Sequence, residues 1–123
     1  MTTTIKEQLE KVLSEIESVG DIELSAIISR HGLLMVSKTT RQDSDSEAFA
    51  ALTATLHMSA ESTTRRLSND KPDSIVVQTP NKHLITYSAG PNALIVVLAG
   101  NTGNLGLILN ALRKASDKVK QII

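Results

Sequence analysis

Apolar residues recur at helical spacing near both ends of the chain. Positions three and four apart lie on one face of a helix, so each stripe predicts an amphipathic helix. Thr4 and Glu7 form a capping box before the first stripe, and Gly20 follows it where a left-handed terminator belongs. The stripes are Ile5, Leu9, Val12, Leu13, Ile16 and Val19 near the start, and Leu105, Ile108, Leu109, Leu112, Ala115 and Val119 near the end.

After the first helix, apolar residues recur at every second position. Ile22, Leu24, Ala26 and Ile28 alternate as the residues of a half-buried strand do, and a second apolar run covers residues 33–36. Gly32 lies between the two runs and can take the positive φ of a tight turn. The pattern therefore predicts an antiparallel hairpin.

A long helix is predicted after a polar, loop-like stretch, from Asp45 to Leu67. Ser44 and Glu47 form a second capping box, and Asp45 adds negative charge where the helix dipole favours it. Residues 68–72, Ser-Asn-Asp-Lys-Pro, are typical of a helix end.

Three more strands are predicted at Ser74–Thr79, Leu84–Ser88 and Ala93–Ala99, with turns at residues 80–82 and 90–92. Such short connections require antiparallel neighbours, because parallel strands need a long crossover. The last strand is apolar on both faces and should lie inside the sheet. The order α-β-β-α-β-β-β-α predicts an α/β fold of the α+β kind.

The long middle helix carries two apolar stripes. The first, expected to face the sheet, is Phe49, Leu52, Leu56, Ala60, Thr63 and Leu67. The second is made of small side chains and one thioether: Ala48, Ala51, Thr55, Met58 and Ser62. Small residues let another helix approach closely, and Met packs against irregular partners. The second stripe either widens the buried face or forms a helix–helix dimer contact.

The strand that follows this helix favours the dimer. Its residues Ser74, Ile75, Val76, Val77 and Gln78 are β-rich and uncharged. At a sheet edge, such a strand invites another strand to pair with it. The helix stripe and the edge strand together predict a dimer interface.

Composition excludes several classes of function. The 123 residues form one domain, 1–123, with 13 basic and 13 acidic residues, one Phe, one Tyr, no Trp and no Cys. Nucleic-acid binding is not expected, because basic tracts and aromatic stacking platforms are missing. The absence of Cys excludes disulfides and thiolate chemistry, which fits the cytoplasm. No apolar run is long enough for a signal peptide or a bilayer span.

The search for catalytic chemistry finds no constellation. The loop Gly100–Gly106 lies between a strand and a helix, but its spacing matches no phosphate-binding motif. We interpret it as a turn in which Asn101 or Thr102 caps the helix. His31, His57 and His83 lack metal-ligand spacing and are expected to be exposed.

The long middle helix has an acidic group at its start and a basic group at its end. The carboxylates Asp43, Asp45 and Glu47 lack the glycine of a calcium loop and suit a solvated helix start. Arg65 and Arg66, with Lys71, form a modest basic cluster that could meet an acidic partner. More often such a cluster complements the dipole of its own helix. We expect no catalytic residue, cofactor or metal.

The chain resembles the Roadblock family, which includes the roadblock-type dynein light chains. The similarity covers essentially the whole chain, and the order and spacing of its pieces carry it. The most specific pieces are residues 21–33, residues 50–56 with 60–63, residues 72–77, and residues 90–98 leading to 104–106.

The resemblance implies a profilin-like fold. In that fold a five-stranded antiparallel sheet carries one long helix on one face and the two terminal helices on the other. It also implies dimers that pair the long helices and join the third strands. Family members commonly regulate or scaffold small Ras-like GTPases, and others are subunits of motor complexes.

Three functional hypotheses follow. The first is a non-enzymatic protein-binding module, a homodimer or a heterodimer with a related chain, that regulates or scaffolds a small Ras-like GTPase. The alternative is a structural subunit or peptide-binding platform of a larger assembly, indifferent to nucleotide state. The third is an enzyme or small-molecule sensor that uses the Gly100–Gly106 loop.

Overall fold

The computed structural model describes residues 3–41 and 45–123, and its elements follow the predicted order. They are α1 (Ile5–Glu17), β1 (Ile22–Ser29), β2 (Leu34–Thr39), α2 (Ser46–Ser68), β3 (Ser74–Gln78), β4 (Lys82–Ala89), β5 (Ala93–Gly100) and α3 (Leu105–Ile122).

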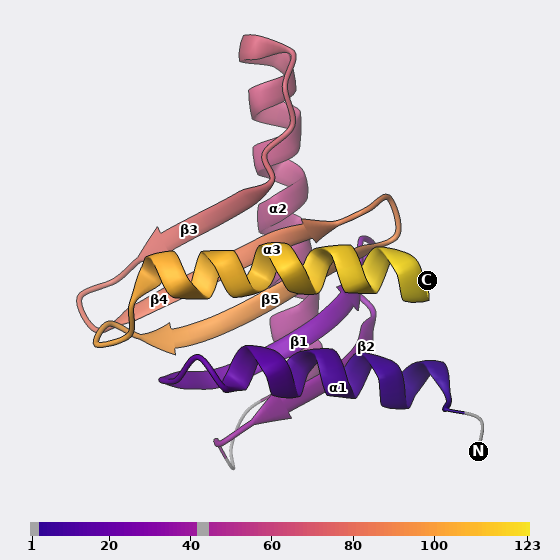
Figure 1. Ribbon diagram of the computed structural model, residues 1–123. Coiled ribbons are helices and arrows are strands. Elements are labelled where there is room, and N and C mark those ends of the chain that lie inside the picture. The colour runs from indigo at the N-terminus through magenta and orange to yellow at the C-terminus, as the bar shows by residue number, and fades with distance from the viewer. Residues whose placement is uncertain (1–2, 42–44) are drawn as a thin grey trace.

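The strands form one five-stranded sheet in the order β2-β1-β5-β4-β3, and every neighbouring pair is antiparallel. In Figure 1, α1 and α3 lie side by side across one face of the sheet, and α2 crosses the opposite face. The predicted sheet, its layers and the interior position of the last strand are therefore confirmed. β3 lies at one edge of the sheet, as the dimer hypothesis requires.

Two apolar clusters cover the two faces of β1 and β5. The larger packs the sheet against α1 and α3, and the smaller packs it against α2. The expectation that β1 is half-buried is wrong, because residues 24–28 are buried on both faces. β1 lies between β2 and β5, and helices cover both faces of the sheet there. Side chains at its even and odd positions are therefore both shielded from water.

The helix caps follow the sequence signals where the chain is described. The Thr4 hydroxyl accepts a hydrogen bond from the Glu7 amide at 3.1 Å, and the Asp45 carboxylate accepts one from the Ala48 amide at 3.1 Å. Gly20 has the predicted positive φ of 92°. Ser44, the predicted cap of α2, and Asp43 lie outside the described residues.

The predicted buried stripe of α2 is wrong for most of its residues, although Phe49 packs against the smaller core cluster. Leu52 and Leu67 are 71% and 82% exposed, Thr63 is exposed, and Phe49, Leu56 and Ala60 are only partly buried. The buried side chains are instead Ala50, Thr53, Ala54 and His57.

Close packing explains this difference. A Cβ atom added to Gly32 would lie 3.1 Å from the Ala51 Cα atom and 3.6 Å from the Ala54 Cβ atom. Only small side chains fit where the β1–β2 turn approaches α2, so the large aliphatic residues point away. The last turns of α2 also project past the β3 edge of the sheet (Figure 1), which leaves Leu67 uncovered.

In the part of the chain that the structure describes, no helix is both long enough and apolar enough to cross a membrane.

We predict that Gly32→Ala destabilises the fold more than Gly20→Ala. Both glycines have φ near +90°, which costs another residue about 1–2 kcal/mol. Only Gly32 also faces backbone at 3.1 Å, whereas nothing lies within 4 Å of an added Cβ at Gly20. Urea unfolding should show an additional loss of about 1–3 kcal/mol for Gly32→Ala, typical of overpacking. Equal losses in the two variants would contradict the close approach of the turn to α2.

Candidate interaction surfaces

The outward face of α2 is uncharged over most of its length. Ala48, Ala51, Thr55, Met58 and Ser62, the predicted dimer-interface stripe, are all exposed, as are Leu52, Ser59 and Thr63 beside them. The alternative that this stripe widens the buried face is therefore wrong. A solvated helix face normally carries charged residues, so an uncharged one with an exposed Leu and Met is unusual.

The β3 strand presents a second unpaired surface. It pairs with β4 on one side only, in a register that runs from Ser74 opposite Tyr87 to Gln78 opposite His83. Val76 packs against the larger core cluster, so Ile75 and Val77 face the α2 side by strand alternation. Both are only partly buried. The outer backbone groups of this short, uncharged strand have no strand partner in the described chain.

An ordered arginine lies at the end of β1. The Arg30 guanidinium donates from Nε to the Gly90 carbonyl oxygen at 3.0 Å, and from its terminal nitrogens to Glu61 at 2.5 Å and Ser88 Oγ at 2.6 Å. The Arg30 and Glu61 side chains are only 19% and 12% exposed. No sequence pattern predicted this network, because its members come from three separate segments and no local motif marks them.

A hollow of about 440 Å³ opens beside Arg30. It is lined by Arg30, Glu61, Arg65, Lys71, Ser88, Gly90 and Pro91. The structure thus brings Arg65 and Lys71, two members of the predicted basic cluster, together with Arg30. Arg66 does not line the hollow and is exposed on α2.

The histidines differ from one another in burial. The expectation that all three are exposed is wrong: only His31 is exposed, His83 is partly buried, and His57 is fully buried. His57 Nδ1 lies 2.8 Å from the Thr86 hydroxyl, and its Nε2 atom has no hydrogen-bond partner. Burial lowers the pKa of His57; the charge of Glu61 raises it and that of Arg30 lowers it.

The Asp21 carboxylate lies against the Gly100–Gly106 loop. The Asp21 carboxylate accepts a hydrogen bond from the Thr102 hydroxyl at 2.5 Å. A Cβ atom added to Gly100 would clash with that carboxylate, so a larger residue there would displace the Asp21 side chain. Asn104 caps α3 through the Leu107 amide at 3.1 Å, which corrects the predicted cap at Asn101 or Thr102. The Asp21 side chain thus lies next to both Gly100 and Gly103 of this loop.

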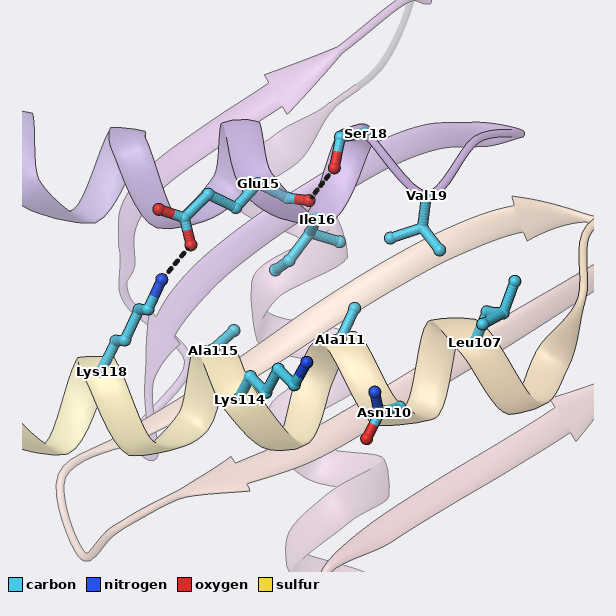
Figure 2. A pocket seen from close by; sticks show the side chains of 10 residues that line it. All are labelled: Glu15, Ile16, Ser18, Val19, Leu107, Asn110, Ala111, Lys114, Ala115 and Lys118. Atoms are coloured by element: carbon cyan, nitrogen blue, oxygen red, sulfur yellow. Dashed lines mark hydrogen bonds and ion pairs between the residues drawn. The ribbon is translucent and has the colours of Figure 1, made fainter.

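A second hollow, of about 290 Å³, lies between α1 and α3 on the opposite face of the sheet. In Figure 2 the small side chains Ala111 and Ala115 point toward Ile16 of α1 and Val19, which follows that helix. An ion pair between Lys118 and Glu15 crosses the gap at one end of this hollow. No sequence pattern predicted this hollow. The apolar stripes of α1 and α3 predicted that each helix packs on the sheet, but not the distance between the two helices.

Among residues 3–41 and 45–123, no group of three or more His, Asp or Glu side chains is placed to hold a metal ion.

Comparison with known proteins shows the domain family that this chain matches. The model of the Roadblock/LC7 domain matches residues 8–99. The uncharacterized protein MJ0714 of Methanocaldococcus jannaschii is 23% identical over 116 residues, which cover 94% of this chain and 97% of that protein.

Solved structures share the fold. Myxococcus xanthus MglB superimposes with a TM-score of 0.89 at 20% identity, covering 99% of this chain and 92% of that one. A structure described as MglB with tetrameric arrangement gives a TM-score of 0.90 at 20% identity, with the same coverage of 99% and 92%. Acanthamoeba castellanii profilin II gives 0.64 at 16% identity, covering 89% and 94% of the two chains, so the predicted profilin-like fold is confirmed.

We predict that the buried His57 makes the fold less stable in mild acid. Because folding lowers its pKa, the unfolded chain binds the proton more readily, at its ordinary pKa of about 6.5. The neutral His57 side chain therefore makes its full contribution to the free energy of unfolding above pH 6.5. As the pH falls toward the folded pKa, the free energy of unfolding decreases by up to about 1.4 kcal/mol per pH unit.

Urea unfolding of wild type, His57→Gln and His31→Gln between pH 7.5 and 5.5 checks this prediction. The His57 variant should lose most of the pH dependence, whereas the exposed His31 variant should keep it. An unchanged pH dependence in His57→Gln would assign the acid sensitivity to another group.

Proposed function

The chain belongs to the Roadblock/LC7 domain family, and from this premise we propose that it is a homodimeric, non-catalytic protein-binding module that regulates or scaffolds a small Ras-like GTPase. The observation that carries the proposal is the uncharged, exposed face of α2 beside the unpaired β3 edge. The proposal places this module in the cytoplasm.

The geometry of the two surfaces supports a two-fold dimer. Joining two β3 strands across a two-fold axis would satisfy their outer backbone groups and extend the sheet into the partner. The turns of α2 that project past the β3 edge would then lie over the sheet of the other subunit (Figure 1). The exposed Leu67 and the stripe from Ala48 to Ser62 would lose contact with water in the same step.

The proposed role toward a GTPase rests on the family. A dimer of this kind offers a broad platform, and it can favour one arrangement of the switch loops of a GTPase without supplying a catalytic group. We assign no arginine finger. Arg65 and Arg66 remain predicted partner-binding residues. Arg65 lines the hollow beside Arg30, and Arg66 does not.

We predict that Thr55→Arg converts the dimer into a folded monomer. Thr55 is exposed in the single chain, so the substitution spares the monomer, but a charge buried between close helices costs several kcal/mol. Self-association should weaken by about 100-fold or more, at about 1.4 kcal/mol per factor of ten.

Analytical ultracentrifugation measures this directly. Gln121→Arg is the matched control, because it adds the same charge to an exposed position of α3 on the opposite face of the sheet. The control should stay dimeric. A dimeric Thr55→Arg variant would show that this face is not the interface, and a monomeric wild type would overturn the dimer altogether.

We predict that a small GTPase from the native lysate binds the immobilised dimer in one nucleotide state. The lysate would be supplied with either GDP or a non-hydrolysable GTP analogue, and retained proteins would be identified by mass spectrometry. A preference of at least about fivefold between the two states corresponds to the coupling expected of a regulator.

The Thr55→Arg monomer is the comparison for this experiment. Retention lost together with dimerisation would support a binding surface built by both subunits. Retention of a GTPase equally in both nucleotide states leaves scaffolding as its role. Retention of other proteins only, indifferent to nucleotide, would favour the structural-subunit alternative.

A further inference from the structure

The hollow beside Arg30 has the features of an anion site. It lies where four segments converge: the end of β1, the inner side of α2, the segment before β3 and the β4–β5 turn. It is separate from the outward face of α2 and from the β3 edge.

Arg30 is held in place before any ligand arrives. Three hydrogen bonds, to Gly90, Glu61 and Ser88, fix the guanidinium plane. A guanidinium has more N–H donors than these bonds use, so Arg30 can still donate to an oxyanion in the hollow. A cation fixed in this way loses little side-chain entropy on binding, which favours recognition of a planar or tetrahedral oxyanion.

The charges around the hollow are unbalanced. Arg30, Arg65 and Lys71 line it against the single carboxylate of Glu61, which leaves an excess of positive charge. Glu61 already pairs with Arg30, and in the described chain the side chains of Arg65 and Lys71 have neither an ion-pair nor a hydrogen-bond partner. Asp70 and Asp73 are close in sequence, but neither lines the hollow.

The spacing along α2 explains why these groups meet. His57, Glu61 and Arg65 are four residues apart and share one side of the helix. His57 contacts Thr86 and Glu61 contacts Arg30, so Arg65 follows on the same side. The helix therefore directs Arg65 into the hollow, whereas the neighbouring Arg66 points elsewhere.

We propose that this hollow binds a phosphate monoester. Such a group carries a charge of about −1.5 to −2 at neutral pH and several acceptor oxygens, which matches the excess positive charge better than a single carboxylate does. Arg65 and Lys71 neutralise the ligand, and Arg30 donates to its oxygens. A hollow of about 440 Å³ also has room for the group that carries the phosphate. That group is either a small metabolite or a phosphorylated side chain of a partner.

NMR titration of the ¹⁵N-labelled wild-type protein tests the site with three probes. Phenyl phosphate represents a small phosphate monoester. A Gly-Gly-phosphoserine-Gly-Gly peptide represents a phosphorylated side chain, and the same peptide with Glu in place of phosphoserine represents a carboxylate. The readout is the shift of the Arg30 Nε–H resonance and of the amides of Gly90 and Lys71.

The variant Arg65→Gln/Lys71→Gln removes the two unpaired cations and leaves the Arg30–Glu61 pair intact. Lys11→Gln/Lys114→Gln removes the same charge from exposed positions of α1 and α3 outside the hollow. We expect saturable binding to wild type and to the control, and at least a tenfold weaker affinity for the first variant. Sedimentation of both variants shows whether they keep the dimer, which separates a failure of this site from a failure of the proposed function.

Two results would support the site and identify its source of phosphate. If the phosphopeptide binds at least tenfold more tightly than phenyl phosphate, the ligand is a phosphorylated side chain of a partner. If phenyl phosphate binds as tightly or more tightly, the ligand is a small phosphate monoester. Equal binding of the Glu peptide would overturn the assignment to phosphate. Shifts that are absent, or that persist unchanged in Arg65→Gln/Lys71→Gln, would overturn the site itself.

Discussion

The turn between β1 and β2 approaches α2 so closely that it decides which side chains the helix buries. Gly32 has a positive φ of 89°, and an added Cβ atom would lie 3.1 Å from the Ala51 backbone. Where this turn meets it, the helix can present only small groups such as Ala50 and Ala54, whereas the larger His57 is buried further along the helix. The larger apolar residues Leu52 and Met58 lie at the surface, beside the stripe proposed as the dimer contact.

The same helix carries different chemistry on its two sides. Its outward side is small, apolar and uncharged, which suits a second copy of the chain. Its inward side runs from the buried His57 through the paired Glu61 to Arg65 at the rim of the hollow. Because the two sides carry different residues, the proposed partner surface and the proposed ligand site can be altered by separate substitutions.

Local patterns predicted the elements well because they depend on neighbouring residues. Helical stripes, caps and turn glycines located α1, α3 and all five strands to within a few residues, and the short turns fixed the antiparallel order. The capping role of Thr4 and the positive φ of Gly20 and Gly32 follow from the same local chemistry. The Roadblock resemblance added how the helices are distributed over the two faces of the sheet.

The sequence by itself therefore determined the element order, the central position of β5 and the uncharged character of β3, whereas the structure placed β3 at the sheet edge. Only the tertiary structure decided which side of α2 is buried, because hydrophobicity ranks Leu52 above Ala50 while the close packing of Gly32 admits only the smaller residue. It also decided the surroundings of Arg30, Asp21 and His57. Each of these depends on segments far apart in the chain, brought together by strand pairing that no local pattern encodes.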